Sequence, residues 1–132
     1  MKVTIEPIKL ITDRRGFVFE PLAAGQLAAH KNSHVVLTEP GGVRGNHYHR
    51  RGTEVLVIVG PSLIRWREDE TIKEFLLRER EAVRMTIPPG IAHAFKNTGN
   101  DPAILVAFSN LDRDDALADV VKDVLIEPLS FK

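Results

Sequence analysis

Short apolar runs alternate with polar turns along most of this chain. The runs are rich in Val, Ile, Leu and Phe, and they are separated by Gly, Pro, Asn and Asp. Their recurrence at roughly 8–12-residue intervals is typical of an antiparallel sandwich or barrel. We therefore expect an all-β fold whose strands cover residues 3–11, 17–20, 34–39, 43–49, 55–59, 63–67, 72–77, 83–87, 93–97 and 103–108.

Alternation within these runs predicts which side chains face the core. In 63–67, Ile64 and Trp66 fall on one face and two arginines on the other. Residues 55–59 are apolar throughout, which is typical of a core strand. Residues 22–30 are rich in alanine, and their pattern leaves open whether they form one helical turn or a loop.

The pattern changes after Asn110. The acidic run 112–119 offers N-cap candidates before a short apolar stripe at Leu117, Val120 and Val121, so we expect one C-terminal helix with a solvated start. A short strand at 124–126 is expected to follow. No linker, internal repeat or low-complexity segment divides the 132 residues, which are expected to form one domain.

Composition narrows the function classes. The chain has no cysteine, which excludes disulfides and thiolate metal sites. Its formal net charge of zero argues against non-specific binding to nucleic acid or membranes. No signal peptide or transmembrane run is recognisable, and we expect a cytoplasmic protein. Arginines nevertheless cluster at 14–15 and 44–51, which suits a small anionic ligand.

Three histidines and one glutamate are the candidate chemical groups. His47 and His49 are two residues apart, so on a strand both imidazoles point to the same face. Glu54 follows a short basic turn, and His93 opens a later strand after a Pro-Pro-Gly turn. If these strands meet in one barrel, the four side chains form a site for a divalent transition metal such as Zn, Fe, Mn or Ni. The alternative is that the histidines are polar residues lining a pocket mouth.

These residues and their neighbours resemble the two motifs of the cupin superfamily. The first motif is matched by His47, Tyr48, His49, Glu54 and Gly60, and the second by Pro88, Pro89, Gly90, His93 and Asn97. Two further stretches, 13–20 and 44–47, resemble the dTDP-4-dehydrorhamnose 3,5-epimerase group and its relatives, the nucleotide-sugar ketoisomerases. Residues 44–49 in particular resemble the cupin domain of capsular-polysaccharide enzymes.

The resemblance implies a double-stranded β-helix, a jelly-roll barrel formed by about residues 16–110. An N-terminal strand segment, 1–12, and a C-terminal helix and strand, 112–128, complete the expected single domain, 1–132. A homodimer is also expected, because the N-terminal strands of such barrels often pair across a two-fold axis and bury an exposed edge.

The resemblance further implies an isomerase or epimerase of a nucleotide-linked 4-keto-6-deoxy sugar. The histidine matching His47 is then the general base that removes the proton α to the ketone. Arg15 and Arg44 match positions near the nucleotide diphosphate, and Asn97 is a further substrate-binding candidate. The 3,5-epimerases use a late tyrosine as partner acid, but the only tyrosine here, Tyr48, is expected to face away from His47. This favours single epimerisation or 3,4-ketoisomerisation.

Glu54 departs from the cupin pattern, because one residue fewer than usual separates it from Gly60. A shift of one residue turns a side chain to the other face of a strand unless a bulge compensates. Glu54 is therefore either a metal ligand or an alternative catalytic base, since a metal-bound His47 cannot also accept a proton. Two alternatives stay open: a metal-dependent dioxygenase with iron on His47, His49, Glu54 and His93, and a non-catalytic cupin that binds a sugar or metabolite.

Overall fold

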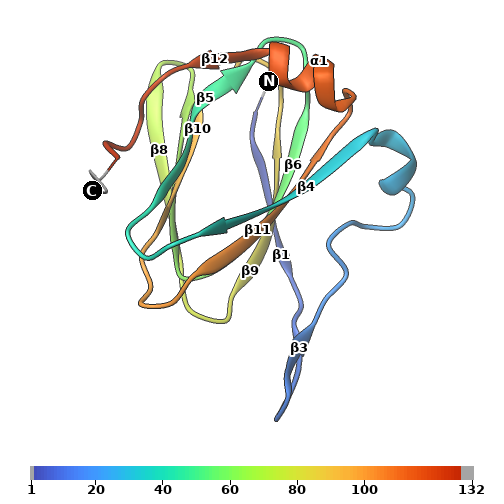
Figure 1. Ribbon diagram of the computed structural model, residues 1–132, viewed down its shortest axis with the longest axis vertical. Coiled ribbons are helices and arrows are strands. Elements are labelled where there is room, and N and C mark those ends of the chain that lie inside the picture. Colours follow the sequence, from blue (N-terminus) through green and yellow to red (C-terminus); the bar gives the residue numbers. More distant parts are fainter. Residues whose placement is uncertain (1, 129–132) are drawn as a thin grey trace.

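The computed structural model describes residues 2–128 and shows two antiparallel five-stranded sheets that face each other as a barrel (Figure 1). The first sheet has the order β1 (Thr4–Ile8), β9 (Ala82–Ile87), β6 (Glu54–Val59), β11 (Ala103–Ser109) and β4 (Asn32–Thr38). The second has the order β12 (Val120–Lys122), β5 (Val43–His49), β10 (His93–Asn97), β7 (Ser62–Glu68) and β8 (Thr71–Leu77). A separate hairpin consists of β2 (Ile11–Asp13) and β3 (Gly16–Val18). The expected all-β jelly-roll barrel with a short C-terminal helix is confirmed.

The barrel interior is built from the side chains that the alternation placed inward. Leu56 of β6, Ile64 and Trp66 of β7, and Met85 of β9 belong to one buried cluster. Along β7 every second residue is buried, as the pattern predicted. The interior of the barrel is therefore the main apolar core of this chain, and the two sheets are held together by it.

The outer face of β6 is also covered, which explains why residues 55–59 are apolar throughout. Val55 and Val57 pack with Phe108 of β11, and Phe19 and Leu22 lie against them from the segment after β3. A strand buried on both faces has no solvent-facing positions that require polar residues.

The C-terminal segment differs from the prediction. Helix α1 spans only Arg113–Ala118, and Asp112 caps it by accepting a hydrogen bond from the Asp115 amide. Val120–Lys122 form β12, which pairs with the free edge of β5, and the strand expected at 124–126 is not formed. The difference arises from tertiary contacts, because the edge of β5 forms backbone pairs with residues 120–122, which precede the apolar residues 124–126. Within residues 2–128, no helix combines the length and apolar character needed to cross a bilayer.

The N-terminal region also departs from the prediction. The strand expected at 3–11 is divided, because β1 pairs with β9 only as far as Ile8 and β2 then pairs with β3. Residues 22–30 contain a single 3-10 turn, Leu27–Ala29. The β2–β3 hairpin projects from the end of the barrel opposite α1 and β12 (Figure 1). Its residues Ile11 and Val18 stand opposite each other and are 67% and 66% exposed.

Candidate functional site

The four candidate side chains converge at one end of the barrel. His47 and His49 lie at the end of β5, Glu54 begins β6 and His93 begins β10. One imidazole nitrogen or carboxylate oxygen of each residue lies within 4.8 Å of the corresponding atom of every other. The convergence expected from their spacing is therefore present.

Strand register explains this convergence. β10 pairs with β5 so that His93 stands opposite His47. Glu54 belongs to the facing sheet, where alternation gives it the same inward direction as Leu56, a residue of the core cluster. The shorter spacing between Glu54 and Gly60 therefore does not turn the carboxylate away from the histidines.

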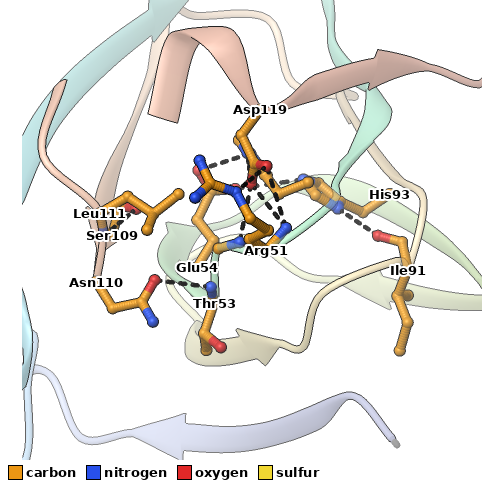
Figure 2. Close-up of polar contacts among 11 residues, drawn as sticks. Arg51, Thr53, Glu54, Ile91, His93, Ser109, Asn110, Leu111 and Asp119 are labelled. Atoms are coloured by element: carbon orange, nitrogen blue, oxygen red, sulfur yellow. Dashed lines mark hydrogen bonds and ion pairs between the residues drawn. The ribbon is translucent and has the colours of Figure 1, made fainter. Parts of the chain in front are cut away.

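The Glu54 carboxylate lies between two imidazoles. Its Oε2 is 3.5 Å from Nε2 of His49, and its Oε1 is 3.3 Å from Nε2 of His93. His93 is 1% exposed, and its Nδ1 lies 3.0 Å from the carbonyl oxygen of Ile91 (Figure 2). Because a carbonyl oxygen only accepts hydrogen bonds, Nδ1 of His93 donates, and the ring is fixed with Nε2 toward Glu54.

The environments of His47 and His49 shift their pKa values in opposite directions. Burial, together with the nearby His93 and His49, lowers the pKa of His47 from 6.5 to about 4 against the attraction of Glu54. The contact with Glu54 raises the pKa of His49 in spite of its burial. Burial favours a raised pKa for Glu54, but its contacts with His49 and His93 hold that pKa below the usual range. At neutral pH the site therefore holds a neutral His47 beside an ionised Glu54.

Asp119 joins this cluster, although the sequence indicated only the solvated start of a helix. Its side chain is 1% exposed, and its Oδ2 lies 3.9 Å from Nδ1 of His49. The carboxylate accepts hydrogen bonds of 3.0 and 2.8 Å from the amides of Arg51 and Gly52 (Figure 2). No spacing rule links residues 49 and 119, because their contact arises only when β12 docks beside β5.

Arg44 lies on the inner side of β5 together with His47 because a bulge interrupts the strand between them. Residues 45–46 have positive φ angles of 83° and 58°, and the register between β5 and β10 shifts there. Arg44 stands opposite Phe95, a core residue, so its side chain starts from the inner face. Its guanidinium donates hydrogen bonds to Oγ1 of Thr38 and to the backbone carbonyl oxygen of Leu37.

Arg15 is not brought to the cluster within one chain. It lies in the turn of the β2–β3 hairpin with its side chain 91% exposed, and it forms a 2.6 Å ion pair with Asp13. That hairpin and the cluster are at opposite ends of the barrel (Figure 1).

Asn97 is also separated from the cluster, at the other end of β10 from His93. Its side-chain amide donates to the carbonyl oxygens of Thr38 and Asp101, and its Oδ1 accepts from the Gly99 amide. Asn97 therefore holds a turn together, and its predicted contact with a substrate has no support in this geometry.

A comparison with known protein families identifies the family of this chain. Residues 11–120 match the family model of the polysaccharide biosynthesis C-terminal domain. This chain belongs to that family. The match agrees with the resemblance of residues 44–49 to capsular-polysaccharide enzymes. A search of curated proteins found no match.

Several solved structures share the barrel. The sugar 3,4-ketoisomerase QdtA from Thermoanaerobacterium thermosaccharolyticum, in complex with TDP, is 19% identical with a TM-score of 0.69, over 92% of this chain and 88% of that one. The dTDP-4-dehydrorhamnose 3,5-epimerase from Sulfolobus tokodaii is 20% identical with a TM-score of 0.70, over 91% and 76%. The capsular polysaccharide assembling protein CapF from Staphylococcus aureus is 23% identical with a TM-score of 0.62, over 91% and 33%. These similarities establish the fold. The three solved structures belong to the groups that the sequence motifs of this chain resemble.

The expectation of a bound divalent metal is wrong. The dTDP-sugar isomerases and epimerases that share this fold act without a metal cofactor. The metal-dependent dioxygenase alternative loses its basis for the same reason. We therefore interpret His47, His49, Glu54 and His93 as an acid–base cluster.

Proposed function

We propose that this chain is an isomerase or epimerase of a nucleotide-linked 4-keto-6-deoxy sugar. The proposal is carried by the half-buried His47, which is neutral at working pH and lies beside an ionised carboxylate and a second imidazole of raised pKa. The family match and the nucleotide-sugar enzymes of the same fold support it. A cytoplasmic location, expected from the sequence, is part of this proposal.

The reaction begins with loss of the proton on the carbon next to the ketone. A neutral imidazole accepts this proton, and His47 is the base in our proposal because its lowered pKa keeps it unprotonated. Loss of the proton gives an enediolate, whose negative oxygen is stabilised by a nearby positive charge. His49, whose pKa is raised by Glu54, contributes positive charge to the site, and the proton that returns to the sugar comes from the protonated His47 or from water.

Return of a proton decides the product. Protonation of the original carbon from the opposite face gives an epimer. Ketoisomerisation instead requires that the proton of the neighbouring hydroxyl moves to the former carbonyl oxygen and that the former carbonyl carbon is protonated, which leaves the ketone at the neighbouring position. Glu54 contributes as a fixed negative charge between His49 and His93. Its two oxygens are engaged by His49 and His93, which hold its pKa below that of His47, so we assign proton abstraction to His47 alone.

The position of Tyr48 favours a reaction at one centre. It is the only tyrosine in the chain, and it packs with Ala92, Ala94 and Leu125 against the outer side of the second sheet. It is therefore directed away from His47 and does not supply a second acid within the barrel. We infer single epimerisation or 3,4-ketoisomerisation.

Binding of the nucleotide diphosphate is proposed to require two copies of the chain. Arg44 lies on the inner face with His47, but Arg15 is held at the far end on the projecting hairpin. A second copy that packs its hairpin against this barrel would bring its own Arg15 toward the cluster. The exposed Ile11 and Val18 of the hairpin give this homodimer an apolar contact surface.

The proposal is tested by incubating the protein with dTDP-4-keto-6-deoxyglucose in deuterated water. Deuterium at C3, followed by NMR together with the ring configuration or ketone position, is the expected result. dTDP-glucose is the matched control, because it carries the same nucleotide but has no proton made acidic by a ketone. Binding of the keto sugar without any deuterium uptake would instead show a non-catalytic sugar-binding cupin and would overturn the proposal.

A further inference from the structure

The C-terminal segment is attached to the strand that carries the site's histidines. β12 pairs with β5 so that Val120 stands opposite His49 and Lys122 opposite His47. Further on, the side chain of Asn46 accepts hydrogen bonds from the amides of Leu125 and Ile126 at 2.9 and 3.0 Å. The same side chain donates to the Ile126 carbonyl oxygen at 2.8 Å. Residues 120–126 are therefore held along β5 at several points.

This attachment places Asp119 against the back of His49. The imidazole lies between two carboxylates, with Nε2 3.5 Å from Glu54 and Nδ1 3.9 Å from Asp119. Gly52 leaves room for the second carboxylate, because a Cβ at that position would lie 3.3 Å from Oδ2 of Asp119. At 3.9 Å the contact is an ion-pair distance and not a hydrogen bond, so the buried Asp119 carboxylate acts on the His49 ring through its charge.

We propose that Asp119 is a positioning residue that holds the His49 ring with Nδ1 toward itself and Nε2 toward Glu54. Its contribution to turnover rests on the proposed function, whereas its effect on the ring does not. The distinction is useful because Asp119 also accepts hydrogen bonds from the amides of Arg51 and Gly52. A purely structural role in that turn would leave the His49 ring unaffected when the charge alone is removed.

The test uses D119N in the full-length chain, because the amide retains an oxygen that accepts from the turn but carries no charge. D123N is the matched control. Asp123 belongs to the same segment and also pairs with an arginine, since its carboxylate lies 3.3 Å from Arg67. It follows the end of β12, whereas the residue opposite His49 is Val120, next to Asp119. Thermal unfolding of both variants shows whether they fold.

The first readout is the NMR spectrum of the imidazole nitrogens and their attached protons in the ligand-free protein. We expect the proton of the His49 ring to reside on Nδ1 in the wild type and in D123N, and the Nδ1 nitrogen and proton signals to shift, broaden or disappear in D119N. The wild-type spectrum tests the proposal even if D119N does not fold. An Nδ1 proton that is absent from the wild type, or unchanged in folded D119N, would overturn the proposal.

The second readout is turnover of the keto-sugar nucleotide. We expect kcat of D119N to fall about 10- to 100-fold, with KM changed less than about threefold and D123N close to wild type. The loss is smaller than the roughly 10⁴-fold effect of removing a carboxylate hydrogen-bonded directly to a catalytic histidine, because this contact is longer. An unchanged kcat with an altered spectrum would show that Asp119 orients the His49 ring but does not contribute to turnover, and would overturn that part of the proposal. Inactive wild-type protein with the expected spectrum would contradict the proposed function and not the positioning of His49.

Discussion

The two ends of the barrel differ in which kind of side chain they bury and which they expose. At the end with α1 and β12, charged and polar side chains are buried, and Glu54 has an imidazole on each side. At the other end a two-stranded hairpin projects, with the apolar side chains of Ile11 and Val18 exposed (Figure 1). One end therefore places polar groups in the interior, and the other places apolar groups in water.

This difference indicates which end is complete within one chain. A buried charge is tolerated when it is paired, and the chain provides the pairing from its own β5, β6, β10 and C-terminal segment. A two-stranded hairpin is only marginally stable by itself, and no described residue covers the outer sides of Ile11 and Val18. The cluster end is thus assembled from one chain, and in our proposal it performs the acid–base chemistry, whereas the hairpin end is proposed to need a second copy.

Replacing the proposed base should have the largest effect. In H47N the asparagine fills similar space but does not accept the substrate proton, so we expect the rate of deuterium exchange into the keto sugar to fall about 10²- to 10⁴-fold. H34N is the control, because His34 is an exposed histidine on β4. Exchange that survives in H47N would assign the base to another residue.

Disrupting the apolar hairpin should have the next largest effect. The double variant I11D/V18D places two charges where the proposed dimer buries apolar side chains, and we expect dimerisation to weaken by about 100-fold or more, measured by analytical ultracentrifugation. L117D is the matched control, since Leu117 is 63% exposed on α1 at the opposite end. A monomeric wild-type protein would contradict the two-copy arrangement, and so would a variant that still dimerises normally.

The pH dependence should show a smaller but distinctive effect. Because the pKa of His47 is lowered from 6.5 to about 4, kcat/KM should stay constant down to about pH 5 and then fall about tenfold per pH unit. The unfolded chain binds this proton more readily than the folded protein, so stability should also decline as the pH falls from 6.5 toward 4. The raised pKa of His49 should move the alkaline decline above pH 6.5. An acid limb centred near 6.5 would show that His47 is not the base.

Local alternation of apolar and polar residues determines much of the fold. The strand at 43–49 has the expected bounds, and the inward faces of β6 and β7 follow from the period of two. The pairing of His47 with His49 on one face is equally local. Their approach to His93 was expected on the condition that the strands meet in one barrel, and it depends on strand order, which alternation does not contain.

Tertiary structure decides the features that depend on contacts between distant segments. The bulge at 45–46 turns Arg44 to the same side as His47, although they are three residues apart. The free edge of β5 recruits Val120–Lys122 and thereby brings Asp119 to His49, while the projecting hairpin separates Arg15 from the cluster. Side-chain direction repeats over neighbouring residues and can be recognised along the chain. The order of strands in a sheet, and the pairing of the C-terminal segment with β5, depend on which distant segments can pair with the same strand edge. They are therefore decided only when the whole chain folds.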